Sequence, residues 1–147
     1  MRSDGLTRQS VAPGSVVLDI DQMSDNLNST GVMYETGGSI TTTGAEQTLL
    51  IMDDPLGIAL VSAVIVDFDA MVGGDTIVFR TYYRIGPGLG MQLYDYDSWV
   101  GADGGLANGE KLDTVSGGYY RYGYRLTIQR TGGVDHAFPW AAWMIGE

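Results

Sequence analysis

Apolar and polar residues alternate along most of the chain, in short runs that glycine and aspartate interrupt. A period of two is typical of a β-strand that turns one face to a core and the other to water. Near the C-terminus, this pattern places five side chains on one face and five on the other. The first set is Tyr120, Tyr122, Tyr124, Leu126 and Ile128, and the second is Arg121, Gly123, Arg125, Thr127 and Gln129.

Runs of this kind recur at intervals of about ten residues, which is typical of an all-β sandwich. The sequence therefore predicts an all-β chain folded as a single antiparallel β-sandwich, jelly-roll-like, with about eight or nine strands. Gly37-Gly38 predicts a hairpin between the first two strands. The predicted strands span residues 32–36, 39–43, 46–52, 60–69, 76–85, 91–99, 110–115, 119–130 and 134–145.

Three of the predicted strands carry a further expectation. The segment from Leu60 to Val66 is apolar on both faces, so its strand is either central or meets another subunit. Pro139 has no N–H to donate, so the last strand lies at an edge or contains a bulge. In the strand over 76–85, the pattern predicts that Ile85 faces the core beside Phe79.

Residues 1–31 differ from the rest because they are polar and irregular around one apolar stretch. So few apolar residues would not stay folded alone. The sequence therefore predicts an N-terminal arm over 1–31 and a β-sandwich domain over 32–147. The arm is either a loose leader or an anchor that docks on a neighbouring molecule. Its interface residues would be Val16, Val17, Leu18, Ile20 and Leu27.

The composition argues against several functions. The chain has no cysteine, which excludes a disulfide, cysteine-bound zinc and a catalytic thiol. Its acidic formal net charge of −10 opposes binding to nucleic acid. Asp outnumbers Glu by 14 to 4, and there are seven Arg against one Lys. This bias suits a halophilic source, although a GC-rich genome would produce the same one.

The distribution of apolar residues predicts no membrane insertion. The longest apolar run, Ile58 to Val66, is too short to span a bilayer. The N-terminus lacks the apolar core of a signal peptide, so we expect folding in a cytoplasm. The final location would differ if the protein leaves the cell as part of a particle.

The sequence offers one candidate metal site and little catalytic chemistry. His136 is the single histidine, and the sequence shows neither the nucleophile nor the orienting carboxylate that a catalytic histidine needs. Asp95 and Asp97 share one strand face, and Asp103 could fold back through a glycine loop, so the three could bind calcium. Their spacing differs from that of an EF-hand, and a solvated acidic strand end is the alternative.

Exposed aromatic residues would provide a carbohydrate platform. The candidates are Tyr94, Tyr96, Trp99, Tyr119 and Trp143. Aromatic residues are also standard strand residues that fill cores and interfaces, which is the alternative.

Four blocks of the sequence carry a resemblance to a known family. They are Thr41–Leu49; Met71–Thr76 with Arg80 and Tyr82; Leu93–Asp97 with Val100–Asp103; and Tyr122–Gly133 with Phe138-Pro139-Trp140 after it. The first looks like a TxxGxEQTL segment, and the fourth resembles a YGxKVTLQQTxG segment in which Arg125 and Arg130 stand in place of the Lys and the second Gln. In this order, the blocks resemble small proteins encoded among the virion structural genes of tailed viruses.

The resemblance implies a β-sandwich subunit of a tailed bacterial or archaeal virus, a phage in the first case. It offers no catalytic residues, so an enzyme is not expected, and apart from the candidate calcium site we expect no cofactor. We expect a viral structural protein, a capsid decoration or vertex-turret subunit, located on the virion after assembly in the host cytoplasm. Its partners would be copies of itself, in a homo-oligomer such as a trimer or pentamer, and the major capsid protein.

Two alternatives stay open. One is a tail, baseplate or head–tail joining subunit. The other is a carbohydrate-binding module that contacts a host-surface glycan through Tyr94, Tyr96 and Trp99.

Overall fold

The computed structural model describes residues 32–52 and 59–146. The chain divides into two units, Met1–Gly31 and Val32–Glu147, and all described residues belong to the second. The predicted arm lies outside the described residues, and so do its interface residues Val16, Val17, Leu18, Ile20 and Leu27.

The described residues form nine strands, and they include no helix that is long and apolar enough to cross a membrane. Turns at glycine and aspartate separate most of the strands, as the sequence pattern predicts. The strands are β1 (Val32–Thr41), β2 (Gln47–Met52), β3 (Ala59–Asp67), β4 (Thr76–Tyr83), β5 (Gln92–Ala102), β6 (Gly105–Leu106), β7 (Leu112–Tyr120), β8 (Tyr124–Gly132) and β9 (Ala137–Gly146).

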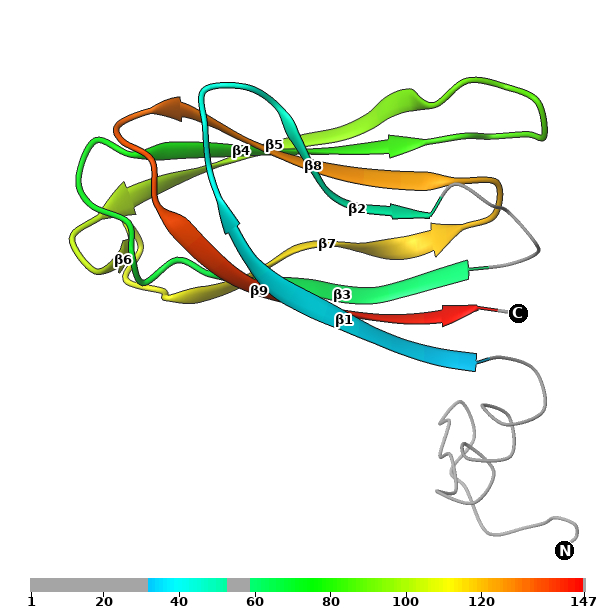
Figure 1. The fold of residues 1–147 in the computed structure, drawn as a ribbon, viewed down its shortest axis with the longest axis horizontal. Coiled ribbons are helices and arrows are strands. Elements are labelled where there is room, and N and C mark those ends of the chain that lie inside the picture. Colours follow the sequence, from blue (N-terminus) through cyan, green and yellow to red (C-terminus); the bar gives the residue numbers. More distant parts are fainter. Residues whose placement is uncertain (1–31, 53–58, 147) are drawn as a thin grey trace, which may run out of the picture. The chain divides into compact units, whose positions relative to one another are not determined.

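The strands form two antiparallel sheets that pack face to face as a β-sandwich (Figure 1). The strand order is β1-β9-β3-β7 in the first sheet and β2-β8-β4-β5-β6 in the second. Without the two-residue β6, eight strands remain, four in each sheet, and the chain passes repeatedly from one sheet to the other. This order is that of a jelly roll, so the predicted fold class is confirmed.

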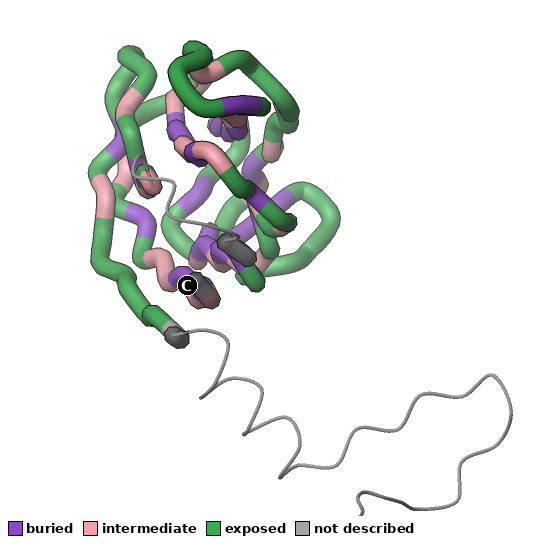
Figure 2. Tube along the Cα trace, turned by 90° about the vertical axis from the view of Figure 1, so that its right-hand side faces the viewer, coloured by how far each residue is buried: buried purple, intermediate pink, exposed green. Residues whose placement is uncertain are grey.

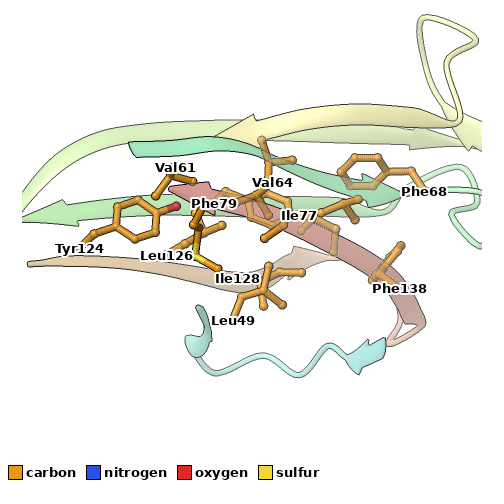
Figure 3. Packing of buried hydrophobic residues seen from close by; sticks show 14 of the residues in the cluster. Leu49, Val61, Val64, Phe68, Ile77, Phe79, Tyr124, Leu126, Ile128 and Phe138 are labelled. Carbon is orange, nitrogen blue, oxygen red and sulfur yellow. The ribbon is translucent and has the colours of Figure 1, made fainter. Parts of the chain in front are cut away.

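The core lies between the two sheets, where buried positions line the inside of both layers (Figure 2). Tyr124, Phe68 and Phe138 are the largest fully buried side chains. Phe68 contacts the rings of Phe79 and Phe138, so residues from both sheets meet between the layers (Figure 3). Burying one such side chain stabilises the fold by about 1.5–3 kcal/mol.

The predicted hairpin at Gly37-Gly38 is wrong, because one uninterrupted strand runs through both glycines. All ten residues of β1 pair with β9, from Val32 opposite Gly146 to Thr41 opposite Ala137. A β-carbon at Gly37 would lie 2.6 Å from the carbonyl oxygen of Trp140. Glycine therefore serves a close approach of two backbones at this position rather than a turn.

The prediction that Pro139 marks an edge strand or a bulge is also wrong, because β9 lies between β1 and β3 and its pairing with β1 has no register shift at Pro139. The pairing of β9 with β3 ends at Trp140, so at Pro139 only β1 is a neighbour, opposite Ser39. Proline is tolerated where one of the two ladders has already ended. The strand that is apolar on both faces, from Leu60 to Val66, is confirmed as a central strand, because β3 lies between β9 and β7.

Two predicted strand ends differ from the structure. Tyr119 and Tyr120 belong to β7, and the chain turns before β8 begins at Tyr124. Gly118 and Gly123 both have positive φ angles, 141° and 142°, so they break the apparent alternation of the tyrosines. Strand β4 ends at Tyr83, which leaves Ile85 72% exposed in the following loop rather than in the core.

Candidate functional site

Polar side chains gather on the outer face of the second sheet, which is the face turned away from the core. Alternation along β4 and β8 places them there, opposite core residues such as Phe79 and Leu126. Arg80 of β4 stands beside Thr127 of β8, and Tyr82 stands beside Arg125. We define the sheet-face network as Glu46, Arg80, Tyr82, Arg125, Thr127 and Gln129.

Glu46 is the centre of the sheet-face network, although it precedes β2 and belongs to no strand. Its Oε2 accepts hydrogen bonds from the hydroxyl groups of Tyr82, at 2.5 Å, and Thr127, at 2.6 Å. Its Oε1 lies 3.9 Å from Nη1 of Arg80. One carboxylate therefore ties the segment before β2 to the two middle strands of the sheet.

The two arginines extend the sheet-face network across the sheet. Nη1 of Arg80 donates to Oε1 of Gln129 at 2.7 Å, and its guanidinium lies 5.3 Å from the centre of the Tyr96 ring on β5. Arg125 lies 4.5 Å from the centre of the Tyr82 ring. At these distances each guanidinium is attracted to the face of its aromatic ring.

The charges of the sheet-face network keep its acid and its phenol away from neutral titration. Burial raises the pKa of Glu46, but hydrogen bonds from Thr127 and Tyr82 and the charges of Arg80 and Arg125 outweigh it and lower the pKa overall. Burial and the hydrogen bond to Glu46 raise the pKa of Tyr82. Neither group is therefore tuned to exchange a proton near pH 7.

A second polar cluster joins three loops at one end of the sandwich. Asp75 is fully buried, and its two oxygens accept hydrogen bonds from the backbone N–H groups of Val72, at 2.9 Å, and Val134, at 3.0 Å. Nε2 of His136 lies 2.9 Å from Oδ2 of Asp75. We call this cluster, with Thr42, the loop clasp.

Thr42 attaches the loop between β1 and β2 to the same cluster. It is fully buried; its backbone N–H donates to the carbonyl oxygen of His136 at 3.0 Å, and its hydroxyl accepts from the backbone N–H of His136 at 3.2 Å. Gly133, with φ +83°, lets the turn after β8 lie directly against Asp75, because a β-carbon at this position would overlap the side chain of Asp75.

The loop clasp keeps Asp75 ionised. Burial raises the pKa of Asp75, but the N–H groups of Val72 and Val134, together with His136, outweigh burial and lower the pKa below its usual 3.8. A histidine beside a buried carboxylate occurs in catalytic triads, where a nucleophile completes the set. The described contacts of His136 are instead with Asp75, Thr42 and the ring of Phe138, which close a loop junction.

The structure separates the three aspartates of the predicted calcium site. Asp95 and Asp97 lie together on β5, and burial, the charge of Asp95 and a hydrogen bond with it raise the pKa of Asp97. Asp103 lies in the turn after β5, where it accepts a hydrogen bond from the N–H of Gly73 at 3.2 Å. No three carboxylate or imidazole groups of the described residues gather closely enough to bind a metal ion.

The aromatic residues of the predicted carbohydrate platform face different directions. Tyr94 packs against the rings of Tyr83 and Tyr120. Tyr96 lies under Arg80 on the outer face. Trp99 packs on Phe68 in the core, and its Nε1 donates to Asp113 at 2.8 Å. Tyr94, Tyr96 and Trp99 therefore do not form one flat surface.

Sequence reasoning missed both polar clusters, because the residues that form them are far apart in the chain. Asp75 and Val134 are 59 positions apart, and Glu46 and Thr127 are 81 positions apart. One signal was present: Glu46, Arg80, Tyr82 and Thr127 all fall within the four blocks that carry the family resemblance.

No protein-family model matches the chain, and no curated protein does. Among solved structures, the chain is similar to one reported under the description "Bacillus endospore appendages form a novel family of disulfide-linked pili". The TM-score is 0.49 and the sequence identity 15%, over 80% of this chain and 88% of that chain. A likeness at this level does not carry the role of any residue from one chain to the other.

Proposed function

We propose that the protein is a structural subunit of a tailed-virus particle, either a capsid decoration or a vertex-turret subunit. In this role it assembles with copies of itself and contacts the major capsid protein. The proposal combines the resemblance of the four sequence blocks with what the polar residues of those blocks do in the fold.

The observation that carries the proposal is the convergence of three blocks on one sheet face. Glu46 of the first block, Arg80 and Tyr82 of the second, and Thr127 of the fourth form the centre of the sheet-face network. These contacts cross-link neighbouring strands and leave both titratable groups far from neutral pKa values. A rigid, multiply cross-linked sheet suits a subunit that must keep its shape within an assembly.

The first test is the mass of the purified full-length chain by light scattering, at low and high salt, with electron microscopy of the same sample. A definite oligomer with closed symmetry is expected, because particle components occupy symmetric positions. A chain that stays monomeric at every salt and protein concentration contradicts self-assembly.

The second test addresses the particle itself. Antibodies against the purified protein, labelled with gold, would be applied to virus particles from the source culture. Label on the capsid is the expected result, and label confined to the tail would favour the tail or baseplate alternative. Particles that carry no label contradict a virion role.

A further inference from the structure

The edges of the two sheets differ in how well they are protected against another strand. Unpaired edge strands accept a further strand unless inward-pointing charges, bulges or shortness prevent it. The edge strands are β1 and β7 in the first sheet, and β2 and β5 with β6 in the second. β6 covers only Gly101 and Ala102, so β5 is free along the rest of its length.

Three of these edges are protected. On β5, Asp95 and Asp97 stand opposite Thr81 and Phe79 on the core-facing side, so the edge carries two inward charges, and its pairing with β4 also shifts register. On β7, Asp113 is an inward charge, and the pairing with β3 shifts register twice. Strand β2 has six residues and a register shift.

The edge at β1 has none of these features. Its ten residues pair with β9 without a register shift. Tyr34 and Thr36 stand opposite the buried Met144 and Ala142, so they belong to the core-facing side, and both are exposed. No charged residue faces inward along the described part of β1, and Gly37-Gly38 leaves its centre without side chains.

We propose that β1 accepts a strand formed by Val16–Ile20 of a second copy of the chain, an inference that rests on the proposed self-assembly. Val16, Leu18 and Ile20 alternate with Val17 and Asp19, which gives the segment one wholly apolar face. That face would cover the exposed core-facing side of β1 and extend the core. Asp19 would point to solvent on the other side.

The donor is a second copy because of the length of the connection. Residues 21–31 separate the segment from Val32, where β1 begins. Hairpin loops usually have about 2–5 residues, so a connection of eleven residues is long for a hairpin. Fully extended, they reach roughly 36–40 Å, which is enough to reach a neighbouring domain of this size. Donation from each copy to the next would build a ring or a filament.

Disulfide trapping tests the proposal. Because the chain has no cysteine, only the introduced cysteines can form a disulfide. Full-length Leu18→Cys and full-length Thr36→Cys would be mixed and oxidised. A disulfide-linked dimer of the two variants is expected, because directly opposed positions of paired strands have β-carbons about 4.5–5.5 Å apart. Val16→Cys and Ile20→Cys in place of Leu18→Cys detect a pairing shifted by two residues.

The matched control replaces Thr36→Cys with Leu93→Cys, an exposed position on the protected β5 edge, and no dimer is expected. The Leu18→Cys/Thr36→Cys double variant tests the other occupant. If it closes within one molecule while the mixed single variants do not link, the chain's own arm covers β1 and the proposal is overturned. If neither sample links, the proposal is overturned as well.

A second pair of variants tests, without cysteines, whether the β1 edge is needed for the oligomer. Thr36→Lys adds an inward charge to β1, as Asp95 and Asp97 do on β5, and is expected to abolish the oligomer seen by light scattering. Ser39→Lys adds the same charge on the outer face and should keep the oligomer. If the Thr36→Lys variant forms the same oligomer as the wild type, only the strand exchange is overturned. If the wild-type chain is itself monomeric, self-assembly is overturned.

Discussion

Burial of the Asp75 carboxylate is unfavourable in free energy by itself, yet its contacts stabilise the fold. A carboxylate removed from water destabilises a protein by several kcal/mol unless its oxygens are hydrogen-bonded. Here two backbone N–H groups and one imidazole nitrogen supply the contacts. The charge therefore holds the loop before β4 to the loop before β9, and Thr42 attaches the loop after β1 through the backbone of His136.

Asp75→Asn is expected to lower the free energy of unfolding by about 3 kcal/mol, because the amide nitrogen that replaces one carboxylate oxygen cannot accept from a backbone N–H group. Urea denaturation measures the change. Asp103→Asn is the matched control, since Asp103 is exposed and accepts one hydrogen bond from Gly73. Its effect should stay within about 0.5 kcal/mol. Equal losses in the two variants would contradict the loop clasp.

Acid should weaken the native protein through the same residue. The pKa of Asp75 lies below its usual 3.8 in the folded state, so the unfolded chain binds the proton more readily. Its contribution is complete above the unfolded value and is lost as the pH falls through the folded value. Denaturation midpoints between pH 6 and pH 2 would measure this, and Asp75→Asn should show a shallower decline below pH 4 than the wild type.

At the scale of the strands, the two adjacent glycines of β1 have opposite surroundings. Gly37→Ala is expected to destabilise by about 2 kcal/mol, because the added carbon would lie 2.6 Å from the carbonyl oxygen of Trp140. Gly38→Ala is the control: its nearest neighbour is 3.9 Å away, so the change should be within about 0.5 kcal/mol. Thermal unfolding of both variants checks this, and a tolerated Gly37→Ala would refute the close approach of β1 and β9.

The sheet-face network predicts a cost for neutralising its central acid. Glu46→Gln should lower the free energy of unfolding by about 1–2 kcal/mol, because the charge-assisted hydrogen bonds that Glu46 accepts from Tyr82 and Thr127 become neutral ones. Glu110→Gln, at an exposed turn where Asn108 is the partner, should be nearly silent. Chemical denaturation compares the two, and a silent Glu46→Gln would contradict a stabilising network.

The strands themselves could largely be predicted from the sequence, and their pairing could not. Alternation and glycine turns located β2, β3 and β4 to within a few residues, because these signals are local. The position of β9 between β1 and β3 depends on contacts across the whole chain. For the same reason Pro139 was misread, because its tolerance depends on where the ladder with β3 ends.

The candidate clusters follow the same division. Asp95 and Asp97 are close in sequence and lie together on β5, while Asp103 lies in the turn that follows this strand. The partners of Asp75 and Glu46 come from distant strands, so only the fold reveals them. Local spacing therefore predicts neighbours on one strand and misses clusters assembled by the sheet.

At the scale of the molecule, β9 connects the first sheet, since it lies between β1 and β3. A chain lacking residues 137–147 would leave β1 with no partner strand and the core open on one side. We expect this truncated chain to be unfolded by circular dichroism and rapidly digested by protease. A folded, resistant truncation would contradict the central role of β9.

The pairing of the first strand with the last also sets the timing of folding. A ribosome releases β1 long before β9, so the nascent chain must hold an incomplete sheet until β9 has been synthesised. Contacts between distant residues of this kind slow folding, and all-β domains typically need milliseconds to seconds. During that interval both sides of β1 are open to other chains, so crowded synthesis of many copies carries a risk of premature association.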